Sequence, residues 1–90
     1  MLAQMPVDLK KVDKKNINRE VLRIGMIAEL DAVNLYEQLA AMATDRKVKA
    51  ALEDIAREEK THLGEFLELL LRLDEEQVEE LEKGKEEIKG

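Results

Sequence analysis

Two stretches of helical periodicity, separated by a break of only two residues, restrict this chain to a helical hairpin. Apolar residues recur at three- and four-residue steps over residues 21–43 and again over about residues 46–71. Thr44–Asp45 is the break between them, and Asp45 is placed to cap the second helix. Because the connection is so short, the two helices must be antiparallel neighbours.

The segment before the first helix shows no clear period. Residues 1–18 contain a proline and a mixture of lysine and aspartate, so we expect a flexible N-terminal arm there. Asn18 is the predicted cap of a helix that begins near Arg19.

A third, shorter helix is expected after the hairpin. Asp74 opens it with the capping-box pattern Asp74-x-x-Gln77, and Gly84 is expected either to end this helix or to weaken it. Residues 19–90 are therefore predicted to form one unit. Its fold class is all-α, an antiparallel two-helix hairpin followed by a short C-terminal helix.

Composition excludes several classes of function. There is no cysteine, so the chain contains neither a disulfide nor a cysteine-built metal site. Tyr36 and Phe66 are the only aromatic residues, and the net charge is −6 without a basic face, so we expect no nucleic-acid binding. No apolar run approaches the roughly 20 residues of a membrane span, and no signal-peptide core follows Met1. We expect a cytoplasmic protein without membrane contact.

A hairpin of two helices cannot enclose a hydrophobic core. A chain of this size buries only about 60–65% of the surface that its unfolded form exposes, and each helix leaves part of its apolar stripe in water. We therefore expect self-association, in which two copies form a four-helix bundle.

Three ionisable residues, Glu29, Glu59 and His62, interrupt the apolar stripes at core positions. Counted from the turn, Glu29 lies about 16 positions before it and the Glu59/His62 pair about 16 positions after it, so all three lie roughly 24 Å from the turn. A buried carboxylate without a partner is costly, which favours a bound cation. On the helix flanks at this level, Asp31, Glu58 and Glu65 are expected to be exposed.

The spacing of these residues indicates a metal site. Glu-x-x-His on one helix with a Glu from its neighbour is half of the set that binds two metal ions between four helices. Two copies supply four carboxylates, whose charge balances two divalent ions, and such mixed ligands suit iron or manganese. Tyr36, two turns after Glu29 on the same face, can hydrogen-bond a ligand carboxylate or donate an electron.

Each feature also has a plainer interpretation. Glu29 can form a salt bridge at an interface, and Tyr36 can be an ordinary core residue. The acidic C-terminal helix can be a solvated face or a funnel for cations. Calcium at other interfaces is possible, although its ligands cannot be placed.

Two segments carry a family likeness. Residues 27–37 (IAELDAVNLYE) resemble the first metal-binding helix of ferritin-like proteins, and residues 56–66 (AREEKTHLGEF) resemble the second. With the short acidic third helix, residues 19–88 most closely resemble the encapsulated ferritins.

This resemblance implies a ferroxidase, which oxidises Fe(II) to Fe(III) at a di-iron centre shared between two subunits. It implies Glu29, Glu59 and His62 as iron ligands, with Tyr36 beside them. It further implies that dimers assemble into a ring-like decamer, which is cargo of an encapsulin shell that stores the iron mineral.

Some members of that family are fused to the shell protein and others carry a C-terminal targeting peptide. Since residues 1–90 contain neither, we expect a piece of a longer chain or another route into the shell. Members often carry more acid and an aromatic residue near the first ligand, where this chain has Ala28 and Leu35, so the resemblance leaves a secondary metal-attraction site beside the centre open.

Two other functions stay open at this stage. One is a rubrerythrin-like di-iron peroxidase, which shares the Glu-x-x-His logic. The other is a non-enzymatic helical oligomer, in which the acidic residues are only solvated or paired.

Overall fold

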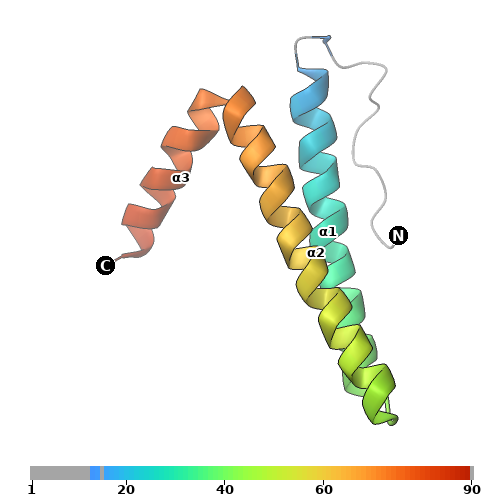
Figure 1. Ribbon diagram of the computed structural model, residues 1–90. Coiled ribbons are helices and arrows are strands. Elements are labelled where there is room, and N and C mark those ends of the chain that lie inside the picture. The colour runs from blue at the N-terminus through green and yellow to red at the C-terminus, as the bar shows by residue number, and fades with distance from the viewer. Residues whose placement is uncertain (1–12, 15, 90) are drawn as a thin grey trace.

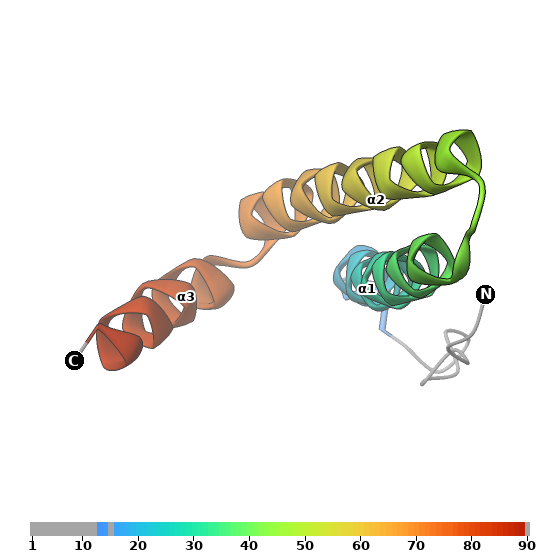
Figure 2. The same ribbon diagram turned by 90° about the horizontal axis from the view of Figure 1, so that it is seen from below.

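The computed structural model describes residues 13–14 and 16–89, which form three helices and no strand. They are α1 (Ile17–Met42), α2 (Arg46–Leu73) and α3 (Glu75–Ile88). Helices α1 and α2 run antiparallel and side by side from the tight turn, whereas α3 turns away from the end of α2 (Figures 1 and 2). This arrangement confirms the predicted all-α hairpin with a short C-terminal helix.

The start of α1 differs from the prediction. Asn16 occupies the capping position, although its side chain makes no capping hydrogen bond, and Ile17 is the first helical residue. The assignment of Asn18 as the cap was therefore wrong, because Asn18 lies within the first helical turn. Most of the predicted flexible arm, residues 1–18, lies outside the described residues.

The cap of α2 follows the prediction. Asp45 adopts an extended backbone, and its Oδ1 accepts a hydrogen bond from the Val48 N–H at 2.9 Å. This bond satisfies one of the backbone donors that every helix leaves free at its N-terminus. Since α1 ends at Met42, only three residues connect the two long helices.

The core of the protomer is thin. Its buried apolar residues lie along the seam between α1 and α2: Leu22, Val33, Ala40, Ala56 and Leu70. Eleven large apolar side chains of the described residues remain exposed. Burial of apolar surface stabilises a fold by about 25 cal/mol per Å². One hairpin therefore leaves apolar surface exposed whose burial would stabilise an association of chains. The sequence predicted that part of each apolar stripe would stay exposed.

Helix α3 begins at Asp74, whose Oδ1 accepts a hydrogen bond from the Gln77 N–H at 3.0 Å. This bond confirms Asp74 as the cap. The helix then continues through Gly84 to Ile88, so Gly84 does not end it. Within residues 13–14 and 16–89, no helix combines the length and apolar character needed to cross a membrane.

Candidate metal centre

Glu29, Glu59 and His62 converge on one point between the two long helices. One ligand atom from each of the three lies within 4.8 Å of the other two. The His62 Nδ1 is 3.5 Å from Glu29 Oε2 and 3.5 Å from Glu59 Oε2. Helix α1 supplies Glu29 and helix α2 supplies the i,i+3 pair, so the structure confirms the shared level that the sequence register predicted.

The cluster lies at an open face of the protomer. The side chains of Glu29 and Glu59 are only 16% and 20% exposed, but that of His62 is 46% exposed. His62 is exposed in a single chain because two helices leave one side of the seam uncovered, and its burial between two copies stays a prediction. A hollow of about 250 Å³ opens beside the cluster, and Glu29 and His62 form part of its lining.

Glu29 is the residue of the cluster that most needs a cation. Its Oε2 is buried without a hydrogen-bond partner among the described residues. Burial raises the pKa of Glu29, and the nearby Glu59 carboxylate raises it further, while His62 acts in the opposite direction. A buried acceptor that has no donor is costly in a folded protein. A metal ion at this point would satisfy that oxygen.

Neighbouring carboxylates also shift the pKa of the His62 imidazole. Desolvation lowers the pKa of His62, but contact with Glu59 and the negative charges of Glu29, Glu59 and Glu65 outweigh it, so the pKa is raised overall. Protons and metal ions therefore compete for these three side chains, since a ligand must be deprotonated to bind a metal. Oxygen donors combined with one imidazole fit iron or manganese.

Tyr36 lies on α1 and is half-buried. Among the described residues of one protomer, Tyr36 does not form the predicted hydrogen bond to Glu29 or Glu59. Of the flanking acids, Glu58 and Glu65 are exposed as expected, whereas Asp31 is half-buried. The prediction did not place Glu65 in the hollow beside His62, although its i,i+3 spacing from His62 is a signal for it.

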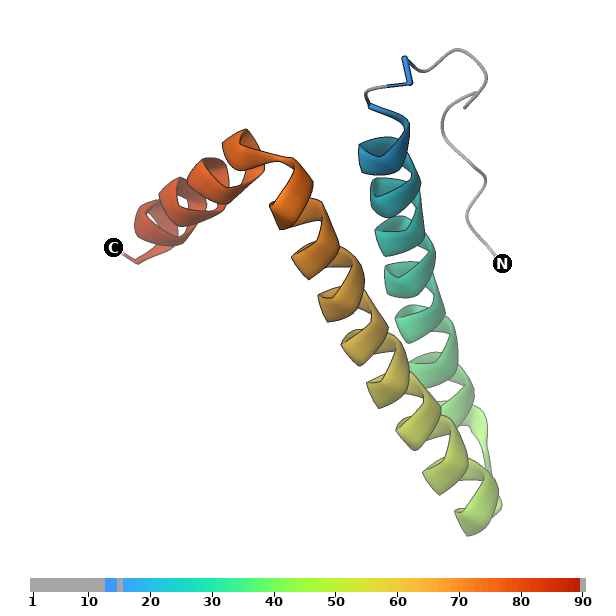
Figure 3. The same cartoon turned by 45° about the horizontal axis from the view of Figure 1, so that its top comes forward.

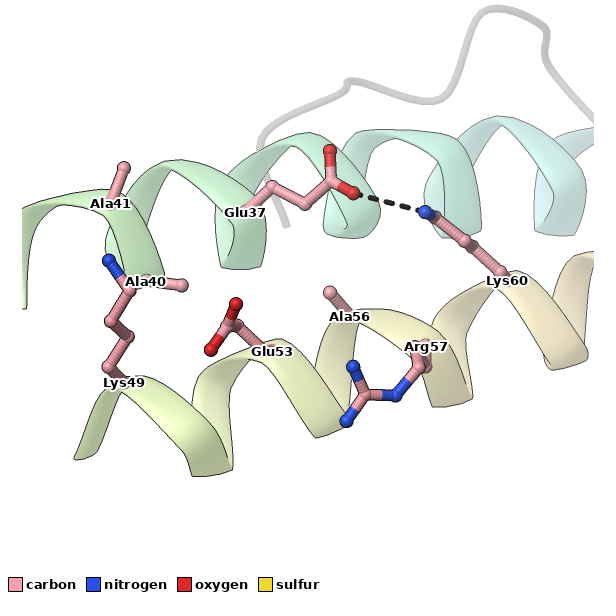
Figure 4. A pocket seen from close by; sticks show the side chains of 8 residues that line it. All are labelled: Glu37, Ala40, Ala41, Lys49, Glu53, Ala56, Arg57 and Lys60. Carbon is pink, nitrogen blue, oxygen red and sulfur yellow. Dashed lines mark ion pairs between the residues drawn. The ribbon is translucent and has the colours of Figure 1, made fainter. Parts of the chain in front are cut away.

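A larger hollow of about 340 Å³ lies near the turn, away from these residues (Figure 4). Three alanines and five charged residues line it, and two of the charged residues form an ion pair, with Glu37 Oε2 and Lys60 Nζ 3.1 Å apart. None of the predicted site residues lines it. In the part of the chain that the structure describes, Glu29, Glu59 and His62 form the single group with the donors for a metal ion, and calcium at other interfaces stays a prediction.

Known proteins are similar to this chain in sequence and in fold. The chain is 60% identical over 70 residues to the ferritin-like-encapsulin shell fusion protein of Pyrococcus furiosus, an alignment that covers 78% of this chain and 20% of that protein. It is 40% identical over 57 residues to the encapsulin nanocompartment cargo protein EncC of Myxococcus xanthus, which covers 63% of this chain and 44% of that one. The chain thus spans less than half the length of either relative.

The crystal structure of the encapsulated ferritin domain from Pyrococcus furiosus matches the fold with a TM-score of 0.84 and 49% identity, over 99% of this chain and 91% of that one. The family model described as EncFtn-like matches residues 4–85. Because this family model spans more than half of the chain and the solved structure shares its fold, the chain belongs to the EncFtn-like family.

Proposed function

We propose that two copies of this chain bind Fe(II) at a shared di-iron centre and oxidise it to Fe(III) for storage inside an encapsulin shell. The observation that carries this proposal is the half-set of ligands: Glu29, Glu59 and His62 converge within 4.8 Å at an open face of one hairpin. The complete set for two metal ions requires a Glu from each of two helices and a Glu-x-x-His from each of two others. A second copy would supply the missing half.

The residues suit Fe(II) as a substrate. Four carboxylates from two chains carry four negative charges, which balance two divalent ions. These hard anionic oxygens favour Fe(III) over Fe(II), because they offset the additional positive charge of the oxidised ion. Two Fe(II) ions together release two electrons, which with two protons reduce one dioxygen to hydrogen peroxide. Glu59 and His62, one helical turn apart, would chelate one iron per chain, and Glu29 would bridge or cap the pair.

The exposed apolar residues support the dimer. Val21, Leu39, Val48, Leu69 and Leu73 are each between 38% and 50% exposed along the two long helices. A second hairpin packed over the cluster would bury such residues and would also cover His62. We further propose that these dimers assemble into a ring of ten subunits.

The names of the relatives support the cellular setting. One relative is a fusion of a ferritin-like segment with an encapsulin shell, and another is an encapsulin cargo protein. We propose that this chain likewise resides in an encapsulin nanocompartment in the cytoplasm, where the shell provides the storage volume.

The activity is tested by oxygenation of Fe(II)-loaded protein, followed through the ultraviolet absorbance of Fe(III). Glu59→Ala and His62→Ala should fall to the rate of Fe(II) in buffer alone. Glu58→Ala is the matched control, because Glu58 is exposed and adjacent to Glu59 but outside the cluster. Wild-type rates in Glu59→Ala would refute the site. Sustained reduction of peroxide with an electron donor, without oxidation of many Fe(II) per dimer, would instead indicate a rubrerythrin-like peroxidase.

The shared centre is tested separately by native mass spectrometry with Co(II), a divalent ion that resists oxidation by air in this type of ligand set. The expected species contain even numbers of chains, with one ion per chain. A single chain that binds Co(II) as tightly as the oligomer would contradict the shared centre. In a crystal grown with Fe(II), an anomalous-scattering map at the iron edge would locate the iron ions directly.

A further inference from the structure

Two arginines of α1 reach across to the point where α2 ends and α3 begins. Arg19 Nε donates a hydrogen bond to the Leu73 carbonyl oxygen at 3.0 Å. Arg23 Nη2 donates to Asp74 Oδ2, also at 3.0 Å. The two bonds join residues that are 54 and 51 positions apart in the sequence. They connect the first helix to the junction that leads into the last one.

Asp74 serves both connections at this junction. Its Oδ1 caps α3 through the Gln77 N–H at 3.0 Å, while its Oδ2 accepts from Arg23. Asp74 is 8% exposed and is the buried charged residue of the described chain. A hydrogen bond between two charged groups is stronger than a neutral one, and partial burial protects it from screening by salt. One carboxylate therefore starts α3 and ties that start to α1.

Beyond the junction, α3 packs against little of the hairpin. It contacts α2 near the junction but makes no contact with α1, and it points away from the hairpin (Figures 1 and 3). Its apolar residues Val78 and Leu81 are exposed, and so is Ile88 near its end. A helix attached only at one end would swing about its connection unless the junction itself were fixed.

We propose that Arg19, Arg23 and Asp74 form a latch that fixes the direction in which α3 leaves the hairpin. Seven glutamates and two lysines lie on α3, so the latch also fixes where this negative charge stands relative to the metal cluster. The latch also keeps the apolar residues of α3 away from the hairpin and in one fixed orientation. The latch acts whether or not the cluster binds iron, because none of its residues belongs to the cluster.

The absence of cysteine makes the test direct. Asn34→Cys on α1 and Glu87→Cys on α3 introduce two exposed sites for spin labels in an otherwise cysteine-free chain. Labelled protein, diluted into an excess of unlabelled protein, reports the distance within one chain by pulsed electron paramagnetic resonance. With the latch intact we expect a single narrow distance distribution.

Two substitutions open the latch in different ways. Arg23→Leu removes the donor. Asp74→Asn keeps a good helix cap, since asparagine caps as well as aspartate, but loses the ion pair with Arg23. Both should at least double the width of the distribution. Arg57→Leu is the control, because it breaks an exposed ion pair within α2 and should leave the width unchanged.

Circular dichroism identifies any variant that has lost helical structure. If Asp74→Asn has lost helix, the test rests on Arg23→Leu, which leaves the Asp74 cap intact. A distribution as narrow in Arg23→Leu as in the intact latch would overturn the proposal. The same holds for a wide distribution in the protein with an intact latch.

Discussion

Replacing Glu29 by glutamine should stabilise the metal-free protein, which is unusual for a substitution at a half-buried position. The ligand oxygens of Glu29 and Glu59 lie within 4.8 Å of each other, and both side chains are at most one-fifth exposed. Two unit charges 4.8 Å apart repel by about 0.9 kcal/mol in bulk water and by about 3.5 kcal/mol at an effective dielectric constant of about 20.

The expected gain lies toward the lower part of this range. The pKa of Glu29 is raised by burial and by Glu59, whereas His62, whose Nδ1 lies 3.5 Å from Glu29 Oε2, offsets part of the repulsion. We expect about 1–2 kcal/mol at neutral pH, and each kcal/mol corresponds to about 4–8 °C in Tm for a domain of this size.

The measurement is urea unfolding followed by circular dichroism, with a chelator and at a fixed protomer concentration, since self-association also contributes to stability. In the presence of Mn(II) at about 100 times its Kd, the wild type should gain about 2.7 kcal/mol. Glu29→Gln should gain almost none, because one carboxylate ligand is absent.

Glu68→Gln is the control for the loss of one negative charge. Glu68 is exposed and pairs with Arg72 on the same helix, so its replacement should change the stability by less than about 0.5 kcal/mol. If Glu29→Gln were less stable than the wild type without metal, the attraction of Glu29 to His62 would outweigh its repulsion from Glu59, and the reasoning from charge repulsion would be refuted.

Three further predictions concern stability. The folded-state pKa values of Glu29 and His62 are both raised, so the folded chain binds more protons than the unfolded one. Their contribution is complete below the unfolded-state pKa values and is lost as the pH rises through the folded-state values, so urea midpoints of the metal-free protein should fall between about pH 5 and pH 8. A midpoint that rises over this interval would contradict this. Gly25→Ala would place a Cβ 3.3 Å from the Phe66 ring. In Gly25→Ala, overpacking that costs about 1–3 kcal/mol should outweigh a gain in helix propensity of about 1 kcal/mol. In Gly64→Ala, the new Cβ would have no atom within 4 Å, so this variant should show the gain alone. Thermal unfolding of the two variants tests this, and equal shifts would disprove it. Asp45→Ala should cost about 1 kcal/mol in the same assay through loss of the α2 cap, and Asp45→Asn should restore most of it.

The hairpin and the cluster of Glu29, Glu59 and His62 could be predicted because both follow from residue spacing and the short turn. Helical periodicity and the Asp45 cap depend on residues within four positions of one another. The spacing of Glu59 and His62 is set by one helical turn. Glu29 could be assigned to the same level because the turn is short, so counting residues along two straight helices gives the register.

The errors arose where neighbouring solutions are close in energy or where burial depends on distant chain segments. Asn16 and Asn18 are both reasonable caps by residue type, and helix ends commonly shift by one or two residues. Of the two expectations for Gly84, only the one that it ends α3 was wrong, because a glycine inside a helix costs only about 1 kcal/mol. Asp31, which was expected to be exposed, is half-buried.

The sequence by itself determined the three helices, the tight turn and the candidate metal ligands Glu29, Glu59 and His62, because each follows from residue spacing along a helix and from the short connection between the two long helices. Only the tertiary structure decided which side of the seam stays open and where α3 points. The contacts of Arg19 and Arg23 with the start of α3 span more than fifty residues. Such contacts depend on how closely two helices pack and which rotamers that packing allows, and no periodic pattern in the sequence encodes them.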